Sequence, residues 1–329
     1  MANKKGVSVV ICTYNGANRL SPTLTHIAQQ KVDKSIDWEV LLIDNNSSDG
    51  SGEIATKIWQ RTACEVPFSV VVETKAGLSH AKARGLKESS KSYLIYVDDD
   101  NSISANYVQK VFDIFEAHQD VAVCSGDGMI AVPDTFSLPT WWEKFQHAYA
   151  VGLQGKREGY SDRSFLWGAS SAFRVSALEQ LYELHELYLT GRIGSKLTAG
   201  EDAELCMSLQ LLGYRLFYSP QLQYQHHIPT DRINRNYLEK VQAGFGASSV
   251  ILSLYSDLLQ NRKTNWGTAY KAARKSVWRK RFRLLRTSGE QLKDIKMNLS
   301  YAKARRNELN RFKDQYDATY ESLKSKFEI

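Results

Sequence analysis

Four short apolar runs in the first hundred residues constrain the fold of this chain more than any other feature. They cover residues 7–12, 38–43, 68–72 and 93–97, and helix-like stretches lie between them. The runs are short and rich in β-branched residues, which is typical of parallel strands buried on both faces. The alternation predicts an α/β fold with an open, mostly parallel sheet, right-handed crossovers and helices on its faces.

The fourth run ends in three adjacent carboxylates, Asp98, Asp99 and Asp100. Adjacent carboxylates raise one another's pKa, and a fold keeps them together where a cation takes up their charge. The triplet therefore predicts a Mg²⁺ or Mn²⁺ site, because these ions accept one or two carboxylates together with substrate phosphate. A solvated acidic turn is the alternative interpretation of the tripeptide alone. Ligands bind at the carboxyl ends of parallel strands, where three further polar residues fall: Thr13, Asn15 and Asp44.

The second half of the chain offers weaker candidates. Glu201 and Asp202 lie in the first turn of a helix that the leucine spacing predicts up to Gly213, where they are either functional or ordinary N-terminal helix acids. His226 belongs to a His pair, which is a weak metal signal by itself. Trp167 and Gly168 lie in a segment rich in Trp, Tyr and Gly, so Trp167 is either a core residue or a platform for a sugar ring.

Composition narrows the class of protein. The chain of 329 residues is 43% hydrophobic and 24% charged, as ordinary globular proteins are. Neither a signal peptide nor an apolar run long enough to span a membrane occurs, so we expect a cytoplasmic protein. The scattered cysteines lack metal-site spacing and predict reduced thiols. No dinucleotide fingerprint and no P-loop is found, so phosphate has to be held in another way.

Taken together, the ordered motifs resemble glycosyltransferase family 2, the inverting nucleotide-sugar transferases with the GT-A fold. The resemblance covers roughly residues 6–245 and rests on six segments: 9–15, 42–50, 77–79, 98–100, 200–202 and residue 226. It implies an α/β catalytic domain over 1–245, with a nucleotide-sugar half at about 1–125 and an acceptor half at about 126–245. It also implies an enzyme that moves a sugar from a nucleotide-sugar to a glycan or lipid-linked acceptor in the synthesis of a surface polysaccharide or glycoconjugate. A UDP-sugar is the expected donor.

The resemblance also implies roles for single residues. Asp202 is the expected general base with Glu201 beside it, and Asp100 is the expected metal ligand with His226 near the metal or diphosphate. Trp167 and Gly168 are expected on the acceptor side. The expected donor-binding residues are Thr13, Tyr14, Asn15, Asp44, Lys82, Arg84, Asp98 and Asp99.

One departure from the family pattern concerns a basic residue. Lys82 takes the place of a family arginine, and Arg84 follows two positions later. Lysine is a point charge without the guanidinium fork. Either Lys82 or Arg84 is therefore expected to make the missing contact.

Two functions of other classes stay open at this point. A nucleotidyltransferase uses similar acids on a similar sheet, although residues 13–16 do not form the glycine-rich basic loop of such enzymes. A nucleic-acid-binding protein would explain the basic C-terminal segment. The absence of a nucleic-acid-binding motif weakens the second alternative, and no nucleic-acid partner is expected.

Residues 246–329 form a helical, basic C-terminal region in this interpretation. The chain has a net charge of +7, and residues 258–289 contain ten Lys or Arg and no acid. Aromatic and apolar residues between 266 and 285 recur at helical spacing. This pattern predicts either that residues 262–286 dock on an anionic membrane, at the inner face of the cell membrane, or that they form a solvated helix that covers the catalytic domain. Further along the chain, apolar residues at three- and four-residue spacing form a seam: Leu292, Ile295, Leu299, Ala302, Leu309, Phe312 and Tyr316. This seam predicts one long helix that either packs on its own chain or forms a homo-oligomer.

Overall fold

The computed structural model describes residues 4–191 and 199–329. An eight-stranded sheet crosses the molecule in the order β3-β2-β1-β4-β9-β6-β10-β8. Its strands are β1 (Lys4–Thr13), β2 (Trp38–Asp44), β3 (Phe68–Val72), β4 (Lys91–Asp98), β6 (Val121–Ser125), β8 (Gly159–Tyr160), β9 (Ala172–Arg174) and β10 (Arg215–Tyr218). The pairs among β1 to β4, and the pair of β6 with β10, are parallel, whereas β8 and β9 run antiparallel to their neighbours. The prediction of a mostly parallel α/β sheet is confirmed.

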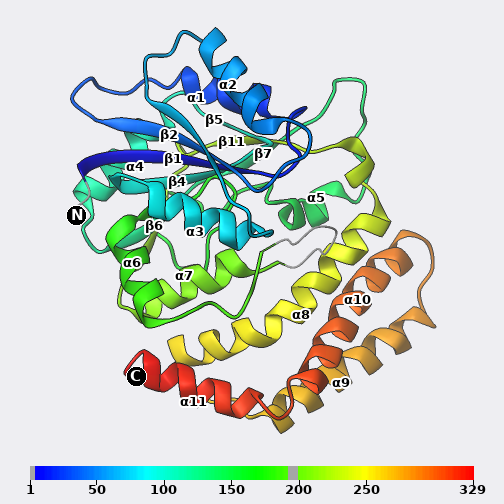
Figure 1. Cartoon of the computed structure of the whole chain (residues 1–329). Helices are drawn as coiled ribbons and strands as arrows, with labels where there is room; N and C mark the ends of the chain where they lie inside the picture. Colours follow the sequence, from blue (N-terminus) through cyan, green and yellow to red (C-terminus); the bar gives the residue numbers. More distant parts are fainter. Residues whose placement is uncertain (1–3, 192–198) are drawn as a thin grey trace.

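Helices cover both faces of this sheet (Figure 1). Val7, Val9 and Ile11 of β1 point into a core that they share with α1 (Leu20–Ala28), α2 (Ser51–Arg61) and α4 (Tyr107–Ala117). Val10 points into the opposite core, which contains α3 (Leu78–Glu88), α6 (Val175–Leu184) and α7 (Glu201–Leu211). Successive side chains of a strand face opposite sides, so a strand covered on both sides needs the nearly continuous apolar run that the sequence has.

A second sheet of three strands positions the end of the acid triplet. Its order is β5-β11-β7, with β5 (Asn101–Ile103), β7 (Gly128–Ala131) and β11 (Tyr224–His227). The antiparallel register pairs His226 with Asn101, and the backbone N–H of His227 donates to the carbonyl of Asp100 at 2.8 Å. Pairing between segments more than a hundred residues apart thus places His226 beside Asp100. A short helical stretch, α5 (Trp142–Phe145) followed by the 3₁₀ helix η1 (Gln146–Tyr149), flanks this sheet, and a second 3₁₀ helix, η2 (Thr230–Arg232), follows β11.

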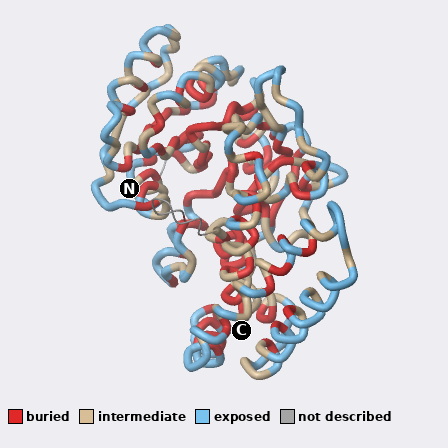
Figure 2. Tube along the Cα trace, turned by 90° about the vertical axis from the view of Figure 1, so that its right-hand side faces the viewer, coloured by how far each residue is buried: buried red, intermediate tan, exposed pale blue. Residues whose placement is uncertain are grey.

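Four helices complete the chain: α8 (Arg235–Leu259), α9 (Trp266–Leu284), α10 (Gly289–Arg311) and α11 (Tyr316–Lys326). Helix α8 packs on α7, α10 lies between α8 and α9, and α11 returns to α8 (Figure 1). The approach of α8 to α10 requires Gly246, because a Cβ there would lie 2.2 Å from the carbonyl oxygen of Tyr301. Figure 2 shows buried residues through the centre of the molecule and exposed outer turns on the C-terminal helices.

The proposed domain boundary at residue 245 falls inside α8, and residues 192–198 of the proposed acceptor half lie outside the described residues. The expected single C-terminal helix is wrong, because the chain turns between α10 and α11 at residues 312–315. Ile295, Leu299 and Leu309 of the apolar seam are buried within the chain. The seam packs against the protein's own helices, which is the first of the two alternatives that the sequence left open.

Two further features are the state of the cysteines and the character of the helices. All four cysteines are free thiols. Across residues 4–191 and 199–329, every helix is too short or too polar to span a membrane.

Candidate functional site

A cavity of about 1010 Å³ opens at the carboxyl ends of β1, β2 and β4. Helices α3, α7 and α8 contribute to its walls, together with the segments at 143–153 and 163–169. Most of the predicted site residues line it: Thr13, Tyr14, Lys82, Asp98, Asp99, Asp100, Trp167, Gly168, Glu201, Asp202 and His226. Tertiary folding therefore collects residues that are spread over more than two hundred positions into one concave site.

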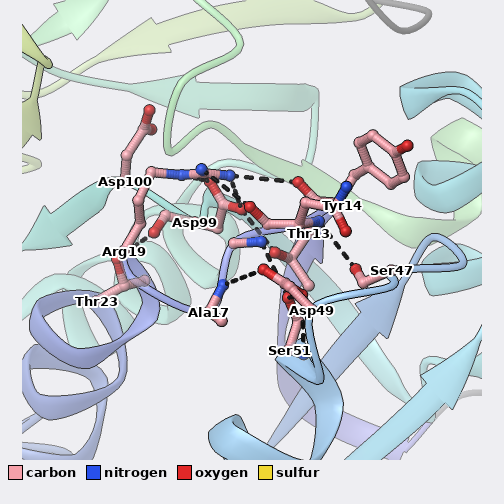
Figure 3. Close-up of polar contacts among 12 residues, drawn as sticks. Thr13, Tyr14, Ala17, Arg19, Thr23, Ser47, Asp49, Ser51, Asp99 and Asp100 are labelled. Atoms are coloured by element: carbon pink, nitrogen blue, oxygen red, sulfur yellow. Dashed lines mark hydrogen bonds and ion pairs between the residues drawn. The ribbon is translucent and has the colours of Figure 1, made fainter.

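The loops after β1 and β2 are tied together beneath the cavity (Figure 3). The backbone N–H of Asn15 donates to Ser47 Oγ at 3.0 Å, and Ala17 N–H donates to Asp49 Oδ2 at 3.0 Å. Asn15 Oδ1 accepts from the backbone N–H of Ser48, and Asp44 Oδ1 accepts from that of Ser47, both at 2.9 Å. Asn15 and Asp44 do not line the cavity in this structure. They shape the loops that carry Thr13 and Tyr14. Tyr14 is 56% exposed, and its ring points away from this cluster (Figure 3).

Asp99 points back into the protein, whereas Asp100 points away from the polar cluster (Figure 3). The Asp99 carboxylate accepts from Thr13 Oγ1 at 2.6 Å and from the Arg19 guanidinium at 2.9 and 3.2 Å. Burial raises the pKa of Asp99, and the hydrogen bond from Arg19 opposes that rise. Asp99 and Arg19 thus form an internal ion pair that anchors the strand end. The only sequence signal for Arg19 was its position four residues after Asn15.

We expect Arg19→Met to lower the free energy of unfolding by about 2 to 3 kcal/mol, because it leaves the Asp99 carboxylate buried without its cation. Urea denaturation followed by circular dichroism measures the change. The matched control is Arg311→Met, which removes an exposed pair with Glu308 and should cost about 0.5 kcal/mol or less. Equal losses in the two variants would contradict a special role for the Arg19–Asp99 pair.

Asp100 and His226 face each other at the cavity wall, with 3.6 Å between Asp100 Oδ2 and His226 Nε2. His226 Nδ1 lies 2.9 Å from the carbonyl oxygen of Tyr149, and this contact makes Nδ1 the donor and directs Nε2 toward Asp100. Burial would lower the pKa of His226, but the Asp100 carboxylate raises it. The protonated, positively charged form of the imidazole is therefore favoured beside the Asp100 carboxylate.

These two residues suit a cation that takes most of its ligands from elsewhere. Within residues 4–191 and 199–329, no group of three or more His, Cys, Asp or Glu is arranged around one metal position. One carboxylate and one imidazole with a second hydrogen bond behind it fit a Mg²⁺ or Mn²⁺ ion completed by diphosphate and water.

Asp202 lies in the first turn of α7, which begins after Gly200 with a φ of 102°. Its Oδ2 accepts from Gly168 N–H at 2.8 Å and its Oδ1 accepts from Ala203 N–H at 2.9 Å. Burial and the charge of Glu201 together raise the pKa of Asp202 to about 6. A Cβ at Gly168 would lie 2.8 Å from the Cβ of Asp202, so glycine is needed for this approach. Gly168 thus positions a carboxylate whose pKa is close to the working range of a general base.

Lys82 joins the two groups of acids. Its Nζ lies 3.7 Å from Glu201 Oε1. Burial would lower the pKa of Lys82, but the charges of Glu201, Asp98 and Asp202 raise it. Arg84 does not line the cavity and instead pairs with Glu88 at 2.9 Å one helical turn further along α3. Of the two candidates for the family arginine, Lys82 is the one that reaches the site.

Trp167 is only 8% exposed, yet it lines the cavity. Its backbone N–H donates to Gln154 Oε1 at 2.6 Å, and the Arg163 guanidinium lies 5.6 Å from its ring centroid. The indole is therefore a core residue that also forms part of the cavity wall, and its role as a platform for a sugar ring stays a prediction.

Sequence reasoning missed the contribution of the C-terminal helices to this cavity. Phe245 and Leu252 of α8 and Tyr301 of α10 line it. Glu204 of α7 was missed as well: it is fully buried and accepts from Tyr255 of α8 at 2.7 Å and from the backbone N–H of Leu189 at 2.6 Å. Its place two residues after Asp202 in the helix was the only available signal.

Solved structures with this arrangement of sheet and helices are GT-A glycosyltransferases. The mannosyltransferase PcManGT from Pyrobaculum calidifontis, in complex with GDP-Man and Mn²⁺, superimposes with a TM-score of 0.54 at 14% identity, covering 98% of this chain and 79% of the other. TarS 1-349 of S. aureus, in complex with UDP-GlcNAc, gives 0.54 at 14% identity and coverages of 96% and 92%. The fold is thus of the GT-A type.

The family model of glycosyl transferase family 2 matches residues 8–182, more than half of the chain. The protein therefore belongs to glycosyl transferase family 2, as its sequence motifs indicated. The cholesterol galactosyltransferase of Borreliella burgdorferi is 33% identical over 125 residues, which are 38% of this chain and 33% of the relative. Glycosyltransferase GlyA of Streptococcus pneumoniae is 25% identical over 244 residues, which are 71% of this chain and 32% of the relative. The match spans about a third of the length of these two relatives.

Proposed function

We propose that this chain is a metal-dependent, inverting glycosyltransferase that uses a nucleotide-sugar, with UDP-sugars as the first donors to test. The observation that carries the proposal is the presence of two separate acidic sites in one cavity. Asp202 is a half-buried carboxylate suited to remove a proton, and Asp100, with His226 3.6 Å away, offers a second carboxylate where a cation could bind. Direct displacement at a sugar carbon needs these two functions and no covalent enzyme intermediate.

The first half of the cavity suits the donor. The exposed ring of Tyr14 offers a stacking surface for the base, and Asp98 offers a carboxylate for the ribose hydroxyls. Thr13 lies behind them and holds Asp99 in place. A Mg²⁺ or Mn²⁺ ion held by Asp100 and His226 would neutralise the charge that develops on the departing diphosphate.

Asp202 takes the proton of the acceptor hydroxyl. The hydroxyl oxygen then forms a bond to the anomeric carbon while the bond from that carbon to the diphosphate oxygen breaks, and the nucleoside diphosphate leaves with the bonding electron pair. Lys82 keeps positive charge next to Glu201, which limits the repulsion between that residue and the ionised Asp202. Attack opposite to the leaving group inverts the configuration at the anomeric carbon.

The apolar residues of the cavity lining favour an acceptor with an apolar part. Phe245 and Leu252 of α8 and Leu153, which is 75% exposed, line the cavity. Trp167 near Gly168 adds an indole where the acceptor would approach Asp202. A lipid-linked or otherwise amphipathic acceptor in surface polysaccharide or glycoconjugate synthesis fits this apolar lining, and such acceptors agree with a peripheral place on the inner face of the cell membrane. No homo-oligomer through α10 is proposed, because the seam that suggested it is buried in the chain.

The test is a panel of UDP- and GDP-sugars incubated with the protein and Mn²⁺, with product nucleotides separated by chromatography. We expect release of nucleoside diphosphate, loss of release with EDTA, and an inverted anomeric configuration in the product by NMR. Release of pyrophosphate would instead identify a nucleotidyltransferase. Turnover that EDTA leaves unchanged would refute the metal dependence.

A further inference from the structure

Helix α9 has two faces with different partners. The inward face carries Ala269, Ala273 and Val277, which are buried, and Trp266, whose indole N–H donates to the Leu309 carbonyl at 2.7 Å. The apolar stripe that the sequence suggested for a membrane is therefore mostly covered by the protein's own helices. The face turned outward begins at Lys271 and continues along the helix at three- and four-residue spacing.

The outward face forms one wall of a groove of about 420 Å³ between α9 and α10. The groove has no acidic residue in its lining, which consists of Lys271, Arg274, Lys275, Val277, Trp278, Arg281 and Arg306. In the part of the chain that the structure describes, none of these five cations has a carboxylate within the 4.0 Å of an ion pair. Five cations without carboxylate partners around one hollow favour an anionic ligand.

Large apolar side chains begin at the groove with Trp278 and continue along the same face of the helix. Trp278 is 65% exposed and Leu285 is 83% exposed, and Phe282 lies between them along the helix. The Trp278 and Phe282 rings are stacked with centroids 5.7 Å apart, and the Arg286 guanidinium lies 4.1 Å from the Phe282 centroid. Aromatic and aliphatic residues beside cations on one exposed stripe are typical of helices that lie in a membrane interface.

We propose that the α9–α10 groove binds the phosphate groups of anionic lipids while Trp278, Phe282 and Leu285 enter the membrane interface. A membrane is the occupant because the cations meet the headgroup charge and the adjacent exposed apolar residues meet the acyl boundary. A soluble polyanion would leave the apolar residues in water.

Membrane docking would bring a lipid-linked acceptor to the apolar residues of the cavity, and this part of the proposal rests on the proposed function. Helix α10 connects the two sites, because Tyr301 lines the cavity and Arg306 lines the groove. Five residues correspond to about 7.5 Å along a helix. Helix α9 lies on the outer side of α10 (Figure 1), so docking through α9 would bring the acceptor end of the cavity close to the lipid surface.

Co-sedimentation with phosphatidylcholine vesicles, with and without phosphatidylglycerol, tests the groove. We expect binding that needs the anionic lipid and weakens as salt rises. The variant Lys271→Gln, Arg274→Gln, Lys275→Gln should bind about 100-fold more weakly, since each basic residue near an anionic leaflet contributes about a factor of five. The matched control Lys31→Gln, Lys34→Gln, Lys57→Gln removes the same charge from exposed positions in the first lobe and should change binding less than about threefold.

A second variant, Trp278→Ala with Leu285→Ala, separates lipid from other polyanions. It should lose about tenfold in vesicle binding and keep any binding of inorganic polyphosphate. Three results would overturn the proposal: an equal loss of vesicle binding in the groove variant and in its matched lysine control, equal binding of the wild-type protein to neutral vesicles, or binding of polyphosphate without binding of vesicles. Calorimetric binding of UDP with Mn²⁺ by the same variants tests the proposed function separately. Lost vesicle binding with intact UDP binding supports the groove, whereas intact vesicle binding without any UDP binding refutes the proposed function alone.

Discussion

Asp202→Asn should lower the turnover of sugar transfer by about 100-fold or more while the dissociation constant of the donor stays within about threefold, because a positioned base contributes to the chemical step rather than to binding. The amide keeps the shape of the side chain, and its one oxygen can accept from Gly168 N–H as Oδ2 does, while the hydrogen bond from Ala203 N–H to Oδ1 is lost. Release of nucleoside diphosphate at saturating donor measures turnover, and calorimetry measures donor affinity. Asn also removes a half-buried carboxylate whose pKa is raised to about 6, which offsets the lost hydrogen bond, so the melting temperature is expected to change little.

The pH dependence provides the control for that assignment. A base works only when deprotonated, so a pKa near 6 predicts that wild-type turnover falls about tenfold per unit as the pH drops below about 6. The ordinary aspartate pKa would place this limb about two units lower. The groups facing Asp202 are Glu201, which raises its pKa, and Lys82, which lowers it. Glu201→Gln should therefore shift the limb to lower pH with a milder loss of turnover, and a larger loss in Glu201→Gln than in Asp202→Asn would assign the base to Glu201.

Asp100→Asn should weaken Mn²⁺-dependent binding of UDP by about 100-fold, because it removes a charged oxygen ligand from a site with few protein ligands. Titration calorimetry with UDP, with and without Mn²⁺, measures the loss. Binding of UDP without the metal should change little, since the neighbouring surface at Thr13 and Tyr14 is untouched.

The contrast with Asp99→Asn makes the experiment specific. Both substitutions remove one charge from the same triplet, but the Asp99 carboxylate is held by Arg19 and Thr13. Asp99→Asn should therefore reduce stability and keep the Mn²⁺ dependence. Loss of the Mn²⁺ dependence in Asp99→Asn, or its survival in Asp100→Asn, would place the cation at a different residue.

Local sequence patterns predicted the positions of some site residues but not the directions of their side chains. The strand ends at Thr13, Asp44 and Asp98 were predictable, because apolar runs fix where parallel strands stop. Whether their side chains line the cavity was not predictable: Asp44 accepts from Ser47 N–H at the base of the loops, while Asp98 lines the cavity. The direction of a side chain at a strand end depends on partners from other elements, and Arg19, eighty residues before Asp99, is the decisive one here.

The basic C-terminal segment shows the same limit. Helical spacing predicted an amphipathic helix there, and α9 is that helix. The pattern did not reveal that α10 covers the stripe containing Ala273 and Val277 and leaves Trp278 exposed. Neighbouring residues of a helix lie about 100° apart, so the position of the partner helix selects which of two adjacent stripes remains at the surface.

Local sequence patterns were enough to predict the α/β class, the family and the segments that meet at the edge of the sheet, because short-range apolar periods and strand-end motifs are local properties of the chain. Three-dimensional contacts were needed to show that Asp99 is paired internally, that Lys82 rather than Arg84 reaches the site, and that α8 and α10 complete the cavity. These outcomes depend on contacts between residues far apart in sequence and on which charge gains a partner when it is buried. A single sequence carries no direct record of such pairing.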